Sequence, residues 1–344
     1  MHVLLVLLTT LRVALVGDPQ VDNPKELDFA RRTIYQELRA RRDLDFVIVL
    51  GDLVNENPAL IAPSEATLDS LGCPWMRIQG NHDGQDFPAD TTFVLGGVRY
   101  ILLNRYSLRE NRQNIPDSVS LRLLGSIEPG QKTIVCTHVP IKDSIMEKYG
   151  SDVFFVSAHE HIIIRRMLRC GAEFLCAGAT CGSFWRGVRD SDGIPNALMN
   201  CGAPRGYFIA DIDPSRNDWH RLSYKCVGRK TSEKLSVHLR DGRLVFNVYG
   251  GSRAGRLQAR IGGKWYSIPF NGVVAPEAQD IIDWNKANMT RERRRTSREE
   301  YIPMRTLKST HTWTVEVPSG LTQKKIRVRY ADPSSSFRTT AVIR

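Results

Sequence analysis

Gly80-Asn81-His82-Asp83 is the stretch of sequence that decides the fold. A largely apolar run over residues 74–78 precedes it, and a glycine stands on each side of Asn81-His82-Asp83. This pattern predicts a buried strand that ends in a tight loop. The loop offers an amide oxygen, an imidazole and a carboxylate within three residues. Turns held by side-chain hydrogen bonds often have a similar composition, so the loop needs support from other parts of the chain.

Two earlier strand ends have the same character. An apolar run over residues 12–16 ends in Gly17-Asp18-Pro19-Gln20, and another over residues 46–50 ends in Gly51-Asp52-Leu53-Val54-Asn55. Between them, Pro24 begins a predicted helix whose apolar residues recur with helical spacing. A short helix near residues 66–71 follows. Alternating strands and helices predict an α/β sheet that is buried on both faces.

Further polar side chains follow apolar runs later in the chain. The run over residues 133–136 leads to His138, and the run over residues 153–156 leads to Ala158-His159-Glu160-His161. His159 and His161 are two residues apart, so they point to the same side of an extended chain. A hairpin over residues 93–104, a helix over residues 118–127 and paired strands over residues 162–168 and 172–177 complete this part of the prediction. Ligands of open α/β sheets gather at the carboxyl ends of the strands, where these polar side chains lie.

One edge of the predicted sheet therefore collects carboxylates, amide oxygens and imidazoles. The set is Asp18, Gln20, Asp52, Asn81, His82, His138, His159 and His161. Clustered carboxylates would repel each other and resist burial, unless divalent cations balance their charge. A nitrogen and oxygen donor set without thiolates suits Mn²⁺, Fe²⁺, Zn²⁺ or Mg²⁺. The number of ligands favours two ions, which can hold a phosphate from both sides.

The order of these motifs resembles that of the calcineurin-like metallophosphoesterases. Their signature is Asp-x-His, Gly-Asp-x-x-(Asp/Asn), Gly-Asn-His-(Asp/Glu), a lone His and Gly-His-x-His. The corresponding blocks here begin at Asp18, Gly51, Gly80, His138 and Ala158. The resemblance implies a four-layer α/β sandwich that hydrolyses phosphate mono- or diesters.

The resemblance also implies a role for each residue. Asp18, Gln20 and His161 would bind the first metal, and Asp52 would bridge both. Asn81, His138 and His159 would bind the second metal. A metal-bound hydroxide would attack phosphorus, and His82 would stabilise the transition state or protonate the leaving oxygen.

Two residues depart from the common signature. Gln20 replaces a histidine, and because an amide oxygen is a harder and weaker ligand, we expect a preference for Mn²⁺ or Mg²⁺ with Mn²⁺ favoured. Asn55 stands where some members have an aspartate that orients the catalytic histidine, a role that we assign to Asn55 here.

The first motif, Asp18-Pro19-Gln20, resembles a bacterial subgroup of the Bacteroidetes type that has a β-rich C-terminal domain. Stretches from Gly182 to Tyr207, from His311 to Trp313 and from Pro318 to Leu321 resemble the same subgroup. In the first stretch, Trp185 and Arg186 are candidates for substrate contact, because arginine suits a phosphate oxygen and tryptophan can stack on a sugar or base. Alternatively, Trp185 packs between the domains.

The charge distribution indicates two domains. Residues 1–214 contain 22 Lys and Arg against 26 Asp and Glu, whereas residues 215–344 contain 26 against 11. We predict a catalytic domain over residues 1–207 and a basic, all-β domain, resembling a β-sandwich, over residues 208–344, with a first strand at residues 207–212. The basic domain invites an anionic polymer or nucleic acid. The charged run at residues 291–300 could bind polyanions, although an exposed loop or helix face is the interpretation that we prefer.

The sequence also excludes several classes of protein. The longest apolar stretch, residues 3–8, is too short to span a bilayer, so we expect no transmembrane segment. It is a poor signal peptide, which leaves open a cytoplasmic protein or an exported one with an atypical or truncated signal. Seven cysteines lack the spacing of a zinc site, and we expect most to be buried thiols.

Three functions fit these observations. The leading hypothesis is a binuclear metal-dependent phosphoesterase. The alternatives are a polyanion-binding protein that has kept the fold and lost turnover, and a nuclease whose basic half grips nucleic acid. The substrate, the choice between monoester and diester, and the oligomeric state remain open at this point.

Overall fold

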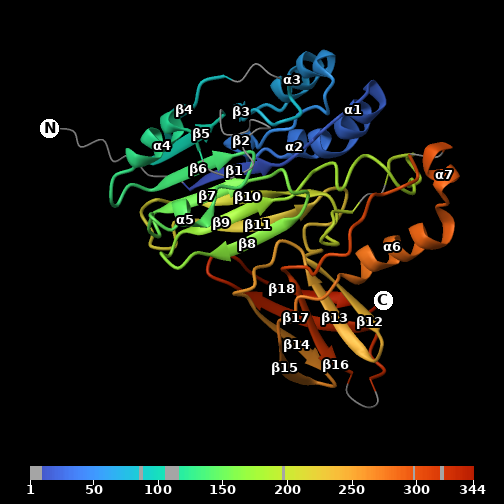
Figure 1. Cartoon of the computed structure of the whole chain (residues 1–344). Coiled ribbons are helices and arrows are strands. Elements are labelled where there is room, and N and C mark those ends of the chain that lie inside the picture. Colours follow the sequence, from blue (N-terminus) through green and yellow to red (C-terminus); the bar gives the residue numbers. More distant parts are fainter. Residues whose placement is uncertain (1–9, 85–87, 105–115, 196–197, 297–298, 318–320) are drawn as a thin grey trace.

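The computed structural model describes residues 10–84, 88–104, 116–195, 198–296, 299–317 and 321–344. The apolar stretch at residues 3–8 and the motif residues 318–320 lie outside this part of the chain. Two sheets with flanking helices form the N-terminal region, and two smaller sheets form the C-terminal region (Figure 1).

The first sheet has the strand order β11-β10-β1-β2-β3. Its strands are β1 (Leu11–Val16), β2 (Phe46–Val49), β3 (Trp75–Arg77), β10 (Gly206–Ile212) and β11 (His220–Cys226). The three N-terminal strands are parallel, whereas β10 pairs antiparallel with β1 and β11 pairs antiparallel with β10. The predicted strand at residues 207–212 therefore belongs to this sheet, and its assignment to the C-terminal β domain is wrong. We propose that the boundary between the domains lies after β11.

The second sheet has the strand order β4-β5-β6-β7-β9-β8. Its strands are β4 (Thr91–Leu95), β5 (Val98–Leu103), β6 (Thr133–Thr137), β7 (Val153–Ser157), β8 (Ile163–Met167) and β9 (Glu173–Ala177). The four central strands are parallel, and the two edge strands, β4 and β8, are antiparallel to their neighbours. Both sheets thus direct the carboxyl ends of parallel strands to one site.

The two sheets pack face to face with helices outside, which confirms the four-layer prediction. Buried side chains of both sheets share one core, including Leu15 and Ile48 from the first and Tyr100, Ile134 and Phe154 from the second. The outer face of the first sheet packs against α1 (Pro24–Ala30), a π-helical turn (Arg31–Tyr35), α2 (Gln36–Ala40), a 3₁₀ turn (Pro58–Leu60) and α3 (Ile61–Asp69). The outer face of the second packs against α4 (Ser118–Gly125) and α5 (Asp143–Met146).

Helix α1 begins where the sequence predicts. The side chain of Asn23 accepts hydrogen bonds from two backbone N–H groups of the first turn, and Pro24 occupies the first helical position. The helical path continues to residue 40, so Leu27, Ala30, Ile34 and Leu38 all become buried on the first sheet.

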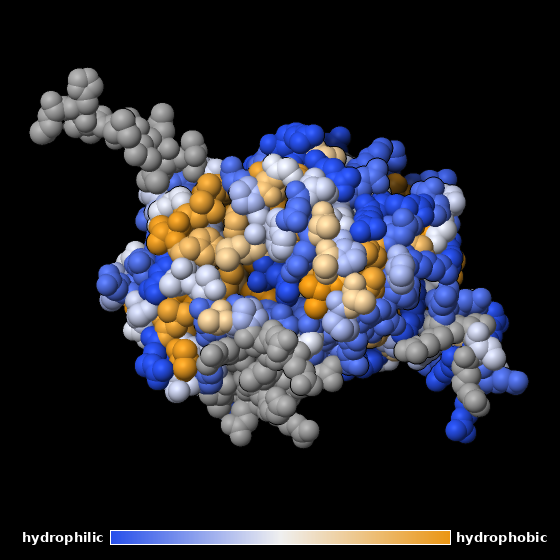
Figure 2. Space-filling view, turned by 90° about the horizontal axis from the view of Figure 1, so that it is seen from above, coloured by the Kyte–Doolittle hydropathy of each residue, from blue (hydrophilic) through white to orange (hydrophobic). Residues whose placement is uncertain are grey.

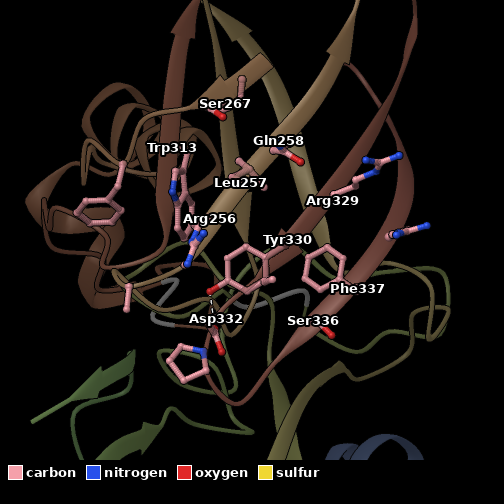
Figure 3. A pocket seen from close by; sticks show the side chains of 17 residues that line it. Arg256, Leu257, Gln258, Ser267, Trp313, Arg329, Tyr330, Asp332, Ser336 and Phe337 are labelled. Atoms are coloured by element: carbon pink, nitrogen blue, oxygen red, sulfur yellow. Dashed lines mark hydrogen bonds between the residues drawn. The ribbon is translucent and has the colours of Figure 1, made fainter. Parts of the chain in front are cut away.

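The C-terminal region consists of two antiparallel sheets around a separate core. One contains β12 (Leu235–Arg240), β13 (Arg243–Val248) and β16 (Thr312–Glu316). The other contains β14 (Arg256–Ile261), β15 (Lys264–Ile268), β17 (Lys325–Ala331) and β18 (Ser336–Val342). Trp313, Tyr330 and Phe337 form part of an aromatic row in this core (Figure 3). Helices α6 (Pro276–Asn288) and α7 (Arg291–Thr296), which the sequence did not predict as separate elements, lie beside the sheets (Figure 1).

A buried ion network joins the two regions. Arg165 of β8 is 1% exposed and pairs with Glu173 of β9 and with Asp332 of the C-terminal region, at 3.0 Å in each case. Asp332 also accepts a hydrogen bond from the Tyr330 hydroxyl (Figure 3). The C-terminal region is therefore attached to the second sheet by charged groups that water does not reach.

The surface seen from above is mostly hydrophilic, with smaller areas of apolar side chains between (Figure 2). Within the described residues, no helix is long and apolar enough to cross a membrane. The expectation for the cysteines is confirmed, because five of the seven are buried and all seven are free thiols.

Candidate metal centre

The structure brings the predicted ligands of both sheets to one site. Asp18 and Gln20 follow β1, Asp52 follows β2, and Asn81 follows β3. His138 follows β6, and His159 and His161 follow β7. The two sheets face each other at these strand ends, so Gln20 and His161, 141 positions apart in sequence, line one pocket.

The backbone is strained at most of these positions. Asp18, Gln20, Asp52, His159 and His161 all have positive φ angles, of 39°, 42°, 47°, 69° and 51°. Such conformations cost a side-chain-bearing residue of order 1–3 kcal/mol each and persist only where the surrounding fold enforces them. The concentration of strain at one set of strand ends indicates a functional site.

Glycine is required twice beside the ligands. Gly51 has φ of 88°, and a Cβ atom there would lie 2.6 Å from Nδ1 of His138. A Cβ atom on Gly80 would lie 2.0 Å from the backbone nitrogen of Asp52. The glycines of both motifs therefore allow the loops to approach each other closely enough for their polar side chains to meet.

His138 lies at the centre of the site. Its Nδ1 is 2.8 Å from the carbonyl oxygen of Leu50, which leaves Nε2 facing the other ligands. Nε2 is 3.0 Å from Oδ1 of Asn81, 3.3 Å from Oδ2 of Asp52 and 3.2 Å from Nδ1 of His159. A backbone carbonyl on the far nitrogen is the usual way to orient a metal-binding histidine.

The buried carboxylates create a demand for positive charge. Asp18 is fully buried, its Oδ1 has no hydrogen-bond partner among the described residues, and burial and the charge of Asp52 raise its pKa well above the ordinary value. Burial alone would lower the pKa of His138, but Asp52 and Asp18 outweigh it and raise this pKa to about 10. Burial alone would raise the pKa of Asp52, but His138 lowers it to about 2. A divalent cation bound here would neutralise the same two carboxylates.

His159 and His161 are held in the neutral form that binds metals. Burial, with the nearby charge of His138, lowers the pKa of His159 to about 4. Burial also lowers the pKa of His161 to about 4. Nδ1 of His161 is 3.1 Å from the carbonyl oxygen of Ser183, and Nε2 is 3.9 Å from Oδ2 of Asp18. Asp52, His138 and His159 offer donor atoms that all lie within 4.8 Å of one another.

Gln20 lies in the site as predicted, with its amide nitrogen toward the other ligands. Nε2 is 3.5 Å from Oδ2 of Asp52 and 3.5 Å from Oδ1 of Asn55, while Oε1 is 3.9 Å from the buried sulfur of Cys181. A half-turn of the amide would exchange the two atoms and present its oxygen as a ligand.

Glu56 contacts the ring of His82. Oε1 of Glu56 is 3.2 Å from Nδ1 of His82, and the backbone N–H of Glu56 donates to the carbonyl oxygen of His82. Oδ1 of Asn55 is 3.5 Å from Nε2 of Gln20, and the orienting role that we assign to Asn55 stays a prediction. Glu56 has a φ angle of 60°, in the left-handed region. This backbone conformation, which the sequence does not show, brings the side chain of Glu56 to the His82 ring.

Asp83 has a structural role in the loop. Its carboxylate accepts hydrogen bonds from the backbone N–H groups of Val54 and Gly80, at 2.9 and 2.8 Å. It thereby fastens the loop after β3 to the loop after β2 and positions His82 against Asp52, whose Oδ1 accepts from the His82 backbone N–H at 2.9 Å.

The prediction of a substrate contact at Trp185 is wrong. Trp185 is 3% exposed, its indole N–H donates to the carbonyl oxygen of Pro19 at 2.7 Å, and the guanidinium of Arg205 lies 4.8 Å from its ring centre. Arg186 packs over the ring of Phe184, 4.9 Å from its centre. Phe184, the residue before Trp185, lines the pocket instead.

A pocket of about 440 Å³ lies over the ligands. Its floor includes Gln20, Asp52, His82, His159 and His161. Its opposite wall comes from the C-terminal region and comprises Tyr301, Pro303, Met304 and Arg305. The sequence contains no signal for this long-range contact, and the prediction missed it.

Two models of known protein families match the chain. A model of the calcineurin-like phosphoesterases matches residues 11–162, and a model of their C-terminal region matches residues 174–336. The chain belongs to the calcineurin-like phosphoesterases, a family of dimetal-dependent enzymes. Its metallophosphoesterase domain is followed by a β-rich C-terminal domain, as the resemblance predicted.

Several solved structures are similar to the chain. They include a dimetal phosphatase from Danio rerio, with 13% identity, coverage of 70% of this chain and 96% of that chain, and a TM-score of 0.45. PhoD shares 10% identity, with coverage of 97% and 72% and a TM-score of 0.41. A 5'-nucleotidase from Candida albicans shares 12% identity, with coverage of 63% and 51% and a TM-score of 0.34. No curated protein sequence matches the chain.

Proposed function

We propose that the protein is a binuclear metal-dependent phosphoesterase that hydrolyses phosphate mono- or diesters. One observation carries the proposal. The fully buried carboxylate of Asp18, with an oxygen that lacks a hydrogen-bond partner among the described residues, lies in a site with Asp52, His138 and two neutral histidines. Two carboxylates in such a place need cations.

The donor set fits two ions. Asp18, His161 and Gln20 would hold the first, and Asp52 would lie between the two. Asn81, His138 and His159 would hold the second. Mixed nitrogen and oxygen donors suit Mn²⁺, Fe²⁺, Zn²⁺ or Mg²⁺, and the amide oxygens of Gln20 and Asn81 favour Mn²⁺. When bound, such ions neutralise phosphate oxygens and lower the pKa of water.

His82 lines the pocket and is the residue that we assign to proton transfer. Glu56 accepts a hydrogen bond from Nδ1–H, so in the imidazolium form the second proton lies on Nε2, which would face the substrate. In hydrolysis, water adds to phosphorus, the bond from phosphorus to the alcohol oxygen breaks, and His82 donates a proton to that oxygen or stabilises the charge that develops on it.

The C-terminal sheet supports a second proposal, an anionic polymer as partner. Arg329 and Arg338 are opposite each other on β17 and β18, and Arg260 and Arg327 are opposite each other on β14 and β17. Like charges in such pairs are destabilising, and an anion would relieve the repulsion. Arg329 lies beside a cavity of about 1110 Å³ (Figure 3). Nucleic acid bound there would dissociate steeply with added salt.

The proposed function is tested with paired chromogenic phosphate mono- and diesters. Metal-stripped protein is assayed against each ester while Mn²⁺ is added. We expect turnover that depends on the metal, and the preferred ester identifies the substrate class. Folded protein without turnover under any divalent metal would contradict the proposal and favour the binding-protein alternative. Because the sequence resembles a bacterial subgroup of the family, we also propose that the protein is bacterial.

A further inference from the structure

The wall of the pocket opposite the metal ligands has a character of its own. Phe184, Tyr301, Pro303 and Met304 contribute aromatic and apolar surface, and Arg305 contributes a positive charge. Four of these five residues come from one segment, residues 301–305, which connects α7 to the strands of the C-terminal region. We call this segment the roof.

The roof is fastened to the catalytic region on its N-terminal side. The carbonyl oxygen of Glu299 accepts a hydrogen bond from the N–H of Gly187 at 2.8 Å. The Glu299 carboxylate pairs with Lys25 of α1 at 3.2 Å and with Arg189. Exposed ion pairs such as these contribute little stability, so the backbone hydrogen bond and the apolar contacts of the roof carry the attachment.

The middle and the C-terminal side of the roof are also held. Ile302 is 5% exposed, and its carbonyl oxygen accepts from the side chain of Asn285 on α6 at 2.8 Å. A Cβ atom on Gly187 would lie 2.5 Å from Ile302, so this contact requires glycine. The backbone N–H of Arg305 donates to Asn200 at 3.1 Å. The roof therefore has a defined position over the ligands.

Ser183 links the roof directly to the metal centre. Its carbonyl oxygen is 3.1 Å from Nδ1 of His161, and its hydroxyl is 3.3 Å from the sulfur of Met304. The ring of Phe184 lies 5.5 Å from the ring of His161. Apolar surface of the roof thus begins immediately beside a metal ligand, where the alcohol part of a phosphate ester would lie.

We propose that the roof and Phe184 form a subsite for the alcohol group of the substrate, and that the substrate is a small phosphate ester of an aromatic or apolar alcohol. This inference rests on the proposed phosphoesterase function. Phe184, Tyr301 and Met304 contact the alcohol, and Arg305 attracts the anionic ester. Methionine and aromatic side chains both make favourable contacts with flat rings.

The dimensions of the pocket favour a small substrate. A volume of about 440 Å³ falls in the range of pockets that enclose small ligands. Arg305 is exposed, so its guanidinium can meet an anion. A polymer would have to pass beneath a segment that is held at both ends.

The subsite is tested by binding, without turnover. Phenylphosphonate and methylphosphonate carry the same anionic group and are not hydrolysed, and each is titrated into the Mn²⁺-loaded protein in a calorimeter. We expect the wild type to bind phenylphosphonate about tenfold more tightly than methylphosphonate, from burial of the ring. Tyr301→Ala and Met304→Ala should each reduce this ratio by about threefold or more. Tyr266→Ala and Met167→Ala are the matched controls. Both positions are exposed and distant in sequence from the roof, so these variants should keep the wild-type ratio.

Equal affinity of the wild type for both phosphonates would overturn the subsite, as would an unchanged ratio in both roof variants. Arg305→Gln should weaken both phosphonates by a similar factor and leave the ratio unchanged, whereas Arg216→Gln, at an exposed ion pair with Asp218, should weaken neither. If Arg305→Gln changes neither affinity, the proposal that Arg305 attracts the anionic group is wrong. Failure of the loaded wild type to bind either phosphonate would contradict the proposed metal centre itself, and the two failures are thereby distinguished.

Discussion

Oε1 of Glu56 lies 3.2 Å from Nδ1 of His82, while the backbone N–H of Glu56 donates to the carbonyl oxygen of the same histidine at 3.0 Å. Through these two contacts, Glu56 holds both the imidazole ring and the backbone of His82. Because the hydrogen bond at Nδ1 determines which nitrogen carries the proton, Glu56 sets the state in which His82 meets the substrate.

We expect His82→Ala to keep both metals and to lose turnover by about 10²–10⁴-fold, the usual contribution of a general acid. Glu56→Gln should lower kcat by about tenfold and shift the alkaline limb of its pH profile to lower pH, because His82 acts as an acid and the charge that supports its imidazolium form is gone. Glu128→Gln, at an exposed turn, is the control. A pH profile of Glu56→Gln identical to that of the wild type would remove its positioning role.

We propose that His138 and Asn81 hold the second metal. We expect His138→Ala to lower the bound metal from two ions per chain to one, because Nε2 of His138 faces Asn81, Asp52 and His159 together. Metal content is measured by elemental analysis after dialysis, with Asn81→Ala as a second variant. Two ions in either variant would count against the assignment.

We propose that Gln20 sets the metal preference of the first site. Gln20→His should shift preference from Mn²⁺ toward Zn²⁺, because an imidazole is a softer ligand than an amide oxygen. Competition between the two metals for stripped protein measures this directly. Should the competition profile match that of the wild type, Gln20 is not a ligand.

The interdomain network centred on Arg165 stabilises the whole chain. Arg165→Met leaves Glu173 and Asp332 buried without their partner, so we expect a loss of about 3–5 kcal/mol in the free energy of unfolding. The neighbouring pair of Arg166 and Asp143 is exposed, and Arg166→Met should cost about 1 kcal/mol or less. Urea unfolding measures both, and equal losses would show that burial of the network is unimportant.

Glu173 makes part of this stability depend on pH. Burial alone would raise the pKa of Glu173, but the hydrogen bond from His220 and the charge of Arg165 lower it to about 2. The ionised carboxylate therefore stabilises the fold above pH 4.5, its ordinary pKa, and this contribution is lost as the pH falls toward 2. We expect the difference in unfolding free energy between wild type and Glu173→Gln to shrink over that range. A difference that is constant from pH 5 to pH 2.5 would contradict the lowered pKa.

The catalytic strands and their polar ends could be predicted because the information is local. Each apolar run leads directly into its motif, and parallel strands bring their carboxyl ends together. For this reason Asp18, Asp52, His138, His159 and His161 lie together as expected. The cap at Asn23 and the helix after it are equally local.

The features that were missed depend on backbone geometry or on distant contacts. The contact of Glu56 with the His82 ring depends on a positive φ at Glu56, which side-chain type alone does not report. The burial of Trp185 depends on Pro19 and Arg205, and the roof depends on contacts of Ile302 and Arg305 with distant residues. The antiparallel addition of β10 to β1 joins residues almost 200 positions apart, a pairing that no strand pattern specifies.

The most direct test of the binuclear centre is a titration of metal-stripped protein with Mn²⁺, in which bound metal and hydrolysis of a chromogenic monoester or diester are measured in the same samples. We predict that binding saturates at two ions per chain and that turnover appears as the second ion binds. Saturation at two ions without turnover would contradict the enzymatic proposal, and failure to bind two ions would contradict the centre itself.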